Sequence, residues 1–468
     1  MHQNYLKTNP NHRVASIDIL RGIAICGMIL CANIGWNSGL PGWMFHAQVP
    51  PPDYTFRPDI AGITWVDLVF PFFLFSLGAS LPFSLKRKIE SEEPAYRIFL
   101  NLLRRWVVLI LFSIILGNFL SASSMHTGKQ ISDIFLITAW AGMFLALGRF
   151  RFKKEILNIS ANISGAVTLI LLAMFMEQIT GIKFSKEKSD IIIMIMAYMA
   201  LSGGLVWYIT RNSLKIRWIM MLLIIGIKAI ASYCPEDIFS TISDTDNIKW
   251  IFRWPFMQYL TIVIAGSAIG DLILFRKDRA IQDKPEIYDF PLAALSLATV
   301  CLQLWGLYTR HIATDLVISC MAASVFLFFK LKKGHLWSDI ISTGYLMMII
   351  GILFDPADGG IRKDPCNISY LLTATGMASI VTGFLILLET RAVARFKILS
   401  WCGQNPMAAY TVTNFITLPV ISLLGLNSAI GAFTDGSPAA GIAKGIVITA
   451  IMVTITAFLS KKKLFWRS

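Results

Sequence analysis

Residues 64–85 read TWVDLVFPFFLFSLGASLPFSL. From Leu68 to Leu85 this stretch contains no charged side chain and is rich in Phe and Leu. About 20 such residues in a helix cross the hydrocarbon core of a bilayer, which is ~30 Å thick. Because lipid offers the backbone no hydrogen-bond partner, a segment of this kind has to be helical. The stretch therefore predicts a membrane-spanning helix.

Similar apolar blocks recur along the 468 residues, which are 55% hydrophobic and only 15% charged. Soluble domains carry about 25% charged residues. We therefore expect an all-α polytopic membrane bundle that forms a single domain over residues 1–468. The fourteen predicted spans are residues 17–35, 64–85, 99–120, 131–149, 156–177, 190–210, 216–232, 252–275, 289–309, 313–331, 338–354, 368–388, 400–424 and 441–460.

The charges between these blocks alternate along the chain. Thirty of the 42 Lys and Arg residues fall on the side that holds both predicted termini, ten fall on the other side, and Lys228 and Lys444 lie inside spans. The positive-inside rule makes the richer side cytoplasmic, which predicts that both termini are in the cytoplasm. The same rule accounts for the net charge of +14, so no nucleic-acid partner is expected. The first 15 residues lack a signal-peptide pattern, so we expect the first helix to stay in the membrane as part of a multi-pass protein.

The longest predicted outer loops are residues 36–63, 233–251, 355–367 and 425–440. The first contains three consecutive prolines, Pro50, Pro51 and Pro52, which favour a stiff, extended backbone. This loop is a candidate lid or site wall, or else a rigid connector. The seven cysteines lie mostly in apolar segments and show no metal-ligand spacing, so no metal is expected.

A polar cluster opens the first span on the cytoplasmic side. Asp18 and Arg21 are three residues apart, share a helix face and can form a pair. Ser16 is placed to cap the helix. The pair either anchors the helix start or also supports a cytoplasmic pocket for an anionic ligand.

A second cluster is expected at the opposite edge of the membrane. Asn33 lies about 22 Å further along the first helix than Asp18, near its outer end. Asp67 lies in the first turn of the next span, and His46 lies in the loop between the two. A histidine in this setting can act as a general base oriented by a carboxylate or an amide. The alternative is that Asp67 only stabilises a helix N-terminus and that His46 is only exposed.

Polar residues also interrupt two late spans. Asn367 and Tyr370 stand at the outer start of the predicted helix 368–388. Asn405, followed by Pro406, and Tyr410 lie within the span 400–424. A broken, polar membrane helix is tolerated where it lines a cavity, and interhelical hydrogen bonding is the equal alternative.

Together these residues resemble a known family. The series of Arg13, Ser16, Asp18, Arg21, Gly22, Asn33, His46, the run from Asp67 to Phe75, and Gly78 resembles the heparan-α-glucosaminide N-acetyltransferase family, in particular its bacterial relatives. The C-terminal part agrees in order, through residues 367–370, Gly403 to Met407 with Tyr410, and Lys462 to Trp466.

The resemblance implies a multi-pass acyltransferase of a bacterial cytoplasmic (inner) membrane. Such an enzyme would pass an acetyl group from cytoplasmic acetyl-CoA to an amino sugar or glycan on the outer face. It carries the catalytic role onto His46, with Asn33 and Asp67 in support. In this interpretation the residues placed to attract CoA phosphates are Arg21, Arg104 and Arg105, with Asp18 beside them. The residues expected to line the substrate cavity are Asn367, Tyr370, Asn405 and Tyr410.

Two other functions stay open at this point. A secondary transporter of a small solute would suit fourteen helices, although matched broken helices in two repeated halves are not evident. An acyltransferase acting on hydroxyls of surface polysaccharide would differ only in the acceptor. Direct transfer, transfer through an acyl-histidine intermediate, and assembly as a homodimer are all compatible with the sequence.

Overall fold

The computed structural model describes residues 14–122, 128–150, 155–233, 253–282, 288–330, 335–392 and 396–466. Within these ranges, thirteen helices are long and apolar enough to cross a membrane. One more helix, α8 (Leu214–Tyr233), is 20 residues long and matches the predicted span 216–232. The protein is therefore a polytopic helical membrane protein, as the sequence predicts. Arg13 lies outside the described residues, and so does the predicted loop 233–251 apart from its first residue.

The helices of the N-terminal half follow the predicted spans within a few residues. They are α1 (Ala15–Asn33), α2 (Trp65–Glu90), α3 (Ala95–Ser121), α4 (Lys129–Leu147), α5 (Glu155–Met174), the short α6 (Met176–Thr180), α7 (Ile191–Thr210) and α8. The largest differences lie at the ends predicted to be cytoplasmic, where helices such as α2 extend through basic residues beyond the apolar segment.

The C-terminal half contains two departures from the prediction. Its helices are α10 (Leu260–Gln282), α11 (Asp289–Thr309), α12 (Ile312–Lys330), α13 (Leu336–Phe354), α14 (Ile368–Ala392), α15 (Lys397–Gln404), α16 (Pro406–Val412), α17 (Leu418–Leu423), α18 (Asn427–Thr434) and α19 (Pro438–Lys461). The predicted helix 252–275 begins with a 3₁₀ turn, Trp254–Tyr259. The predicted single helix 400–424 is broken at Asn405 and contains a π-helical turn, Thr413–Thr417. Pro406 and Pro419 lack the N–H that an uninterrupted helix requires.

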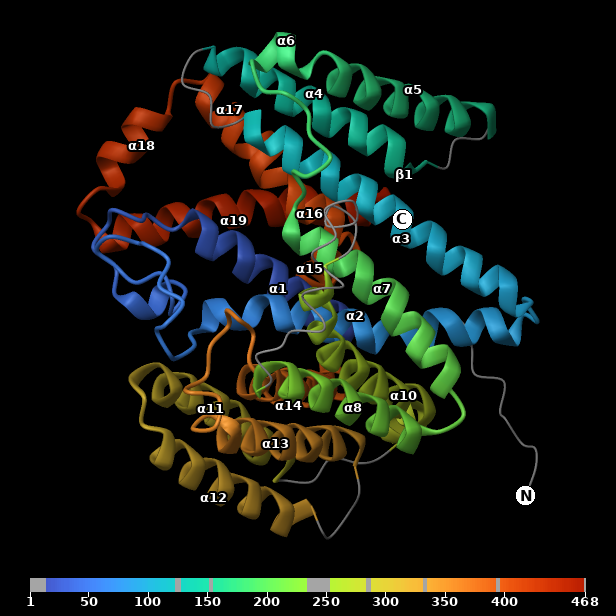
Figure 1. The fold of residues 1–468 in the computed structure, drawn as a ribbon, viewed down its shortest axis with the longest axis vertical. Coiled ribbons are helices and arrows are strands. Elements are labelled where there is room, and N and C mark those ends of the chain that lie inside the picture. Colours follow the sequence, from blue (N-terminus) through green and yellow to red (C-terminus); the bar gives the residue numbers. More distant parts are fainter. Residues whose placement is uncertain are drawn as a thin grey trace.

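Loops predicted on one side of the membrane meet one another at one end of the bundle. The loop between α1 and α2 lies at the left in Figure 1, near the loop between α13 and α14, and Gln48 Nε2 in the first donates to the carbonyl of Asp364 in the second at 2.6 Å. At the opposite end, a two-residue strand pair joins β1 (Gly148–Arg149) to β2 (Phe465–Trp466). Below, the "outer" end is the one with the α1–α2 loop, following the orientation predicted from the charges.

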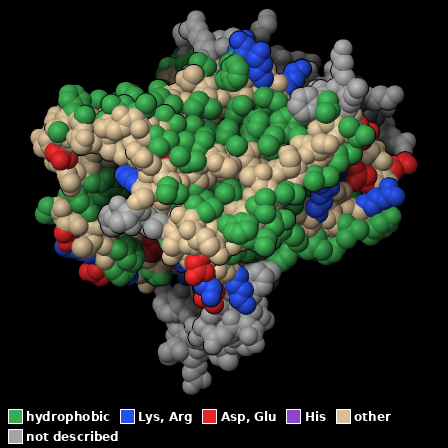
Figure 2. All heavy atoms as spheres, turned by 90° about the horizontal axis from the view of Figure 1, so that it is seen from above, with side chains coloured by type: hydrophobic (Ala, Val, Ile, Leu, Met, Phe, Trp, Pro, Cys, Tyr) green, Lys and Arg blue, Asp and Glu red, His purple; other side chains and the backbone are tan. Residues whose placement is uncertain are grey.

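Helices α5 and α12 cover the two ends of the long axis in Figure 1, and their apolar side chains face outward. On α5, Ile156 is 72% exposed and Met174 66% exposed. Figure 2 shows the face above α4 and α5 covered mainly by hydrophobic side chains, with charged side chains mostly at its margins. Such a surface suits contact with lipid rather than water.

The interior is built by close helix crossings. A methyl group at Gly78 of α2 would overlap the carbonyl of Val263 on α10, and one at Gly266 would overlap the carbonyl of Phe75. Small residues at such crossings allow membrane helices to approach closely. Because α2 carries Asp67 at its outer end, this packing holds one wall of the candidate site in place.

Candidate functional site

The second helix begins with a reciprocal cap that fixes the position of Asp67. Thr64 Oγ1 accepts from Val66 N at 3.2 Å, and the Asp67 carboxylate accepts from Thr64 N at 2.9 Å. This Thr-x-x-Asp arrangement is a capping box. Asp67 therefore does stabilise the helix N-terminus, as the sequence-based alternative predicts, but this role uses only one carboxylate oxygen, Oδ2.

The other carboxylate oxygen of Asp67 binds His46. His46 Nδ1 lies 2.6 Å from Asp67 Oδ1, and Ala47 N donates to Oδ2 at 3.2 Å. Since an ionised carboxylate only accepts, Nδ1 carries the hydrogen, and Nε2 of a neutral ring is left as the acceptor. Asp67 is 2% exposed, whereas the His46 side chain is 33% exposed. The predicted convergence of His46 and Asp67 at the outer end is present in the structure.

A second loop contributes a residue that the sequence did not indicate. Lys363 Nζ lies 3.4 Å from His46 Nδ1. Its ammonium group supplies a positive charge beside the buried Asp67 carboxylate, so the imidazole is not the only available counter-charge. Lys363 is held there because Gln48 also accepts from Asp364 N at 3.0 Å. Nothing in local spacing connects residues 317 positions apart.

Asn33 is not part of this arrangement as predicted. It is buried at the last turn of α1, and its Nδ2 donates to the carbonyl of Ile29 at 2.8 Å, within its own helix. The described contacts do not join it to His46 or Asp67. An amide near a helix end can donate to a carbonyl of its own helix. The position of Asn33 along the helix therefore predicted its depth in the membrane but not its hydrogen-bond partner.

At the inner end, the predicted pair of Asp18 and Arg21 forms, but the arginine is already engaged. Arg21 Nη1 lies 3.4 Å from Asp18 Oδ1 and donates to the carbonyl of Gly403 at 3.1 Å. Its Nε and Nη2 donate to the side chain and carbonyl of Ser76 at 3.3 and 3.1 Å. Arg21 thus ties α1 to α2 and α15, which weakens the prediction that it holds CoA phosphates.

The prediction that Ser16 caps α1 is wrong. The residue before the helix is Val14, which makes no side-chain cap, and Ser16 Oγ has no hydrogen-bond partner among the described residues. Instead Glu389 of α14 accepts from Ala15 N at 3.2 Å and from Ser16 N at 2.8 Å. A carboxylate at this position satisfies free N–H groups and is favoured by the helix dipole.

Arg104 and Arg105 differ from each other. Arg104 is exposed on α3. Arg105 has its Nε buried without a hydrogen-bond partner among the described residues, and the guanidinium of Arg21 is close enough to repel it. Two neighbouring cations, one lacking a hydrogen-bond partner at Nε, form a setting that favours an anion.

Three of the four predicted cavity residues serve instead to hold the fold together. Tyr370 donates its hydroxyl to the carbonyl of Asp67 at 2.7 Å, which braces the first turn of α2. Asn367 accepts from Tyr370 N at 3.2 Å and donates to the carbonyl of Gly360 at 2.7 Å. Asn405 donates to the carbonyl of Leu464 at 2.9 Å and accepts from Trp466 N at 3.1 Å, so it holds the C-terminal strand.

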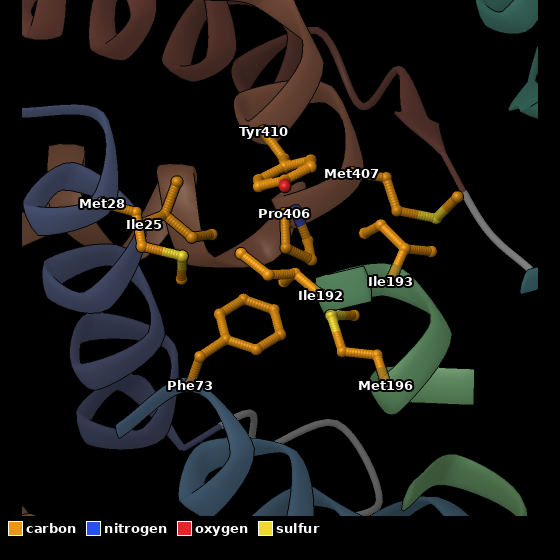
Figure 3. Close-up of a pocket in the computed structure, with 9 residues that line it drawn as sticks. All are labelled: Ile25, Met28, Phe73, Ile192, Ile193, Met196, Pro406, Met407 and Tyr410. Carbon is orange, nitrogen blue, oxygen red and sulfur yellow. The ribbon is translucent and has the colours of Figure 1, made fainter. Parts of the chain in front are cut away.

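Tyr410 does line a pocket. The pocket is small, with a volume of about 10 Å³ that has room for about one water molecule, and it lies between α1, α2, α7 and α16. Figure 3 shows apolar side chains from these four helices, among them Ile25, Met28 and Phe73, pointing toward a common space, with Tyr410 at its border. Ile25 is one helical turn beyond Arg21 toward the outer end, so the pocket lies between the inner arginines and the outer His46.

A model of one protein family matches residues 13–273, more than half of the chain; the family is described as a domain of unknown function, DUF5009. The chain belongs to this family. No curated protein matches it. The region shared with DUF5009 contains His46, Asp67, Arg21 and Arg105, whereas Lys363 lies beyond it.

Among the described residues, no group of three or more His, Cys, Asp or Glu side chains is arranged to hold a metal ion. Close to the outer site, Cys366 is buried, which raises the pKa of its thiol to about 12. A thiol of this kind is inert as a nucleophile at neutral pH. The described outer end of this DUF5009 member presents the imidazole of His46 paired with the carboxylate of Asp67.

Proposed function

We propose that this protein is a membrane acyltransferase that moves an acetyl group from cytoplasmic acetyl-CoA to an amino sugar or another glycan on the outer face, in a bacterial inner membrane. The observation that carries the proposal is the hydrogen bond between His46 Nδ1 and Asp67 Oδ1, with Nε2 on the side of the ring that remains for a substrate. A carboxylate-oriented histidine is a common general base.

The chemistry follows from the tautomer that Asp67 imposes. The acceptor amine attacks the thioester carbonyl, and His46 Nε2 takes the proton that the nitrogen loses. The carbon–sulfur bond then breaks, and the departing CoA thiolate takes up that proton from the imidazolium. Asp67 stabilises the transient imidazolium. Before His46 takes up the proton from the acceptor, Lys363 balances the negative charge of the Asp67 carboxylate. A hydroxyl acceptor would follow the same course.

The route for the donor is supported by the order of features along α1. Arg21 and Arg105 lie toward the inner end, the apolar pocket lies next, and His46 lies at the outer end. Arginines suit the phosphates of CoA, and Arg105 is the better candidate because Arg21 is occupied by Ser76 and Gly403. The apolar lining of the pocket matches the uncharged pantetheine and acetyl portion, and the proposal requires the pocket to widen when the donor enters.

Vesicles containing the purified protein test the proposal directly. With radiolabelled acetyl-CoA on the cytoplasmic side and glucosamine on the other, we expect label to appear on glucosamine. His46→Ala should lower the rate at least about 100-fold, which is the usual contribution of a general base. His311→Ala is the matched control, because His311 is an exposed outer histidine that contacts only Thr309 through its ring. Wild-type rates in His46→Ala would refute the assignment.

Transport is the second candidate, and the broken helix at Asn405 favours it, since discontinuous helices often mark transporter sites. Movement of glucosamine into vesicles without consumption of acetyl-CoA would support transport over transfer.

A further inference from the structure

A second polar site lies between α11 and α12, away from His46. The buried face of α11 contains Ser296, Thr299 and Gln303, and the facing side of α12 contains Asp315 and Ser319. Asp315 is 2% exposed, and Gln303 and Ser319 are fully buried. Ionisable groups inside a membrane are costly and usually functional.

Three oxygen atoms at this interface have no hydrogen-bond partner among the described residues: Asp315 Oδ2, Gln303 Oε1 and Ser319 Oγ. Gln303 Nε2 donates to the backbone carbonyl of Asp315 at 3.0 Å, which fixes the amide. Serines in helices commonly donate to the carbonyl four residues earlier, as Ser296 does to Leu292 at 3.1 Å. For Ser319 that carbonyl belongs to Asp315, and its hydroxyl does not bond to it.

The charge of Asp315 is also not balanced by direct contact. The nearest cation, Arg310, donates both Nη groups to Asp355 at 2.9 and 2.8 Å. His311, the other titratable neighbour, is exposed and bonds to Thr309. The carboxylate packs directly against Gly306, where a methyl group would overlap Asp315 Oδ1. A buried ionised carboxylate without a partner is strongly unfavourable, so it either takes up a proton or binds a positive charge.

We propose that Asp315, Gln303 and Ser319 bind a monovalent cation, Na⁺, between α11 and α12. Carboxylate, amide and hydroxyl oxygens are the ligands that hard cations prefer. One carboxylate among neutral oxygens balances a single positive charge. The site lies at the outer end, because Asp315 is in the first turn of α12, beside the Arg310–Asp355 pair that holds the 355–367 loop.

Thermal unfolding of the full-length protein in detergent tests this proposal. NaCl is raised at constant ionic strength, with choline chloride as the replaced salt. A cation that binds only the folded state raises the melting temperature in a saturable way. We expect this increase for the wild type. Asp435→Asn, which removes an exposed outer carboxylate, should retain it, and Asp315→Asn should lose it.

Two further variants keep the test decisive if Asp315→Asn does not fold. Ser319→Ala removes one ligand and should raise the half-saturating Na⁺ concentration about tenfold. Gly306→Ala should displace the carboxylate and abolish the increase. No Na⁺-specific increase in the wild type, or an increase that persists in these variants, overturns the proposal. If lower pH in choline raises the melting temperature while Na⁺ at neutral pH does not, Asp315 holds a proton and the proposal is overturned.

Discussion

The ion pair of Arg310 and Asp355 holds the loop that brings Lys363 to His46, and removing its two members should have unequal effects. Asp355 is 4% exposed at its side chain and also accepts from Ile361 N at 2.7 Å, whereas the Arg310 side chain is 34% exposed. If Asp355 is neutralised, the guanidinium can turn to water. If Arg310 is removed, the carboxylate stays buried.

The expected magnitudes follow from this asymmetry. Arg310→Ala leaves a buried charge unpaired, which costs about 3–5 kcal/mol. Asp355→Asn keeps the shape of the side chain and an acceptor for Ile361 N. It loses the charged hydrogen bonds to Arg310, which should lower the stability by about 2 kcal/mol. The double variant Arg310→Ala with Asp355→Ala should lose less than Arg310→Ala alone, because no buried charge remains from the pair.

Trypsin cleavage after Arg362 and Lys363 reports opening of this loop. When opening is fast relative to cleavage, the rate follows the open population. The rate should rise at least 100-fold in Arg310→Ala and about 30-fold in Asp355→Asn, since each 1.4 kcal/mol is about tenfold. Arg57→Ala is the control: its pair with Asp53 is 50% and 39% exposed, and such a surface pair contributes about 0–1 kcal/mol. Equal increases in the two single variants would refute the reasoning.

Three shorter predictions concern other contacts. Glu389→Ala should lower stability by about 1–2 kcal/mol in thermal unfolding, because α1 loses its cap, whereas Ser16→Ala should have no measurable effect. Asn405→Ala should release the C-terminal strand and speed tryptic cleavage after the exposed lysines 461–463, because Leu464 and Trp466 lose the side chain that binds their backbone. Since its pKa is raised to about 12, Cys366 should resist maleimide at pH 8 until the protein is unfolded, as peptide mass spectrometry can show.

The spans were predictable because the bilayer acts on each segment by itself. A run such as 68–85 has no alternative to a helix in lipid, whatever the rest of the chain does. The break at Asn405 was indicated by the following proline, but the π-helical turn at Thr413–Thr417 depends on how α16 and α17 pack against α4 and α19. Propensity within one segment contains no information about that packing.

Site residues were predictable only where both partners lie close in the sequence or where a short loop joins them. Asp18 with Arg21 and Thr64 with Asp67 follow from helix periodicity. Glu389 at α1 and Lys363 at His46 do not, because residues 373 and 317 positions apart are brought together by the order of helices in the bundle. The same limit applies to Arg217, whose partner Asp271 lies 54 positions away in the sequence. It is fully buried against Asp271, and its Nε donates to Thr210 Oγ1 at 3.0 Å.

The long-range contacts in turn give independent support for the predicted alternation of loops. Gln48 binds Asp364, Gly436 N donates to the carbonyl of Asn37 at 3.0 Å, and each contact joins two loops assigned to the outer side. Arg276 pairs with Asp339 between helix ends assigned to the inner side. An odd error in the number of spans between two such loops would place them at opposite ends of the bundle, where they could not touch. The alternation of basic charge and the contacts of the folded chain therefore both constrain the number of spans between these loops. They do so through unrelated physical effects, and they agree.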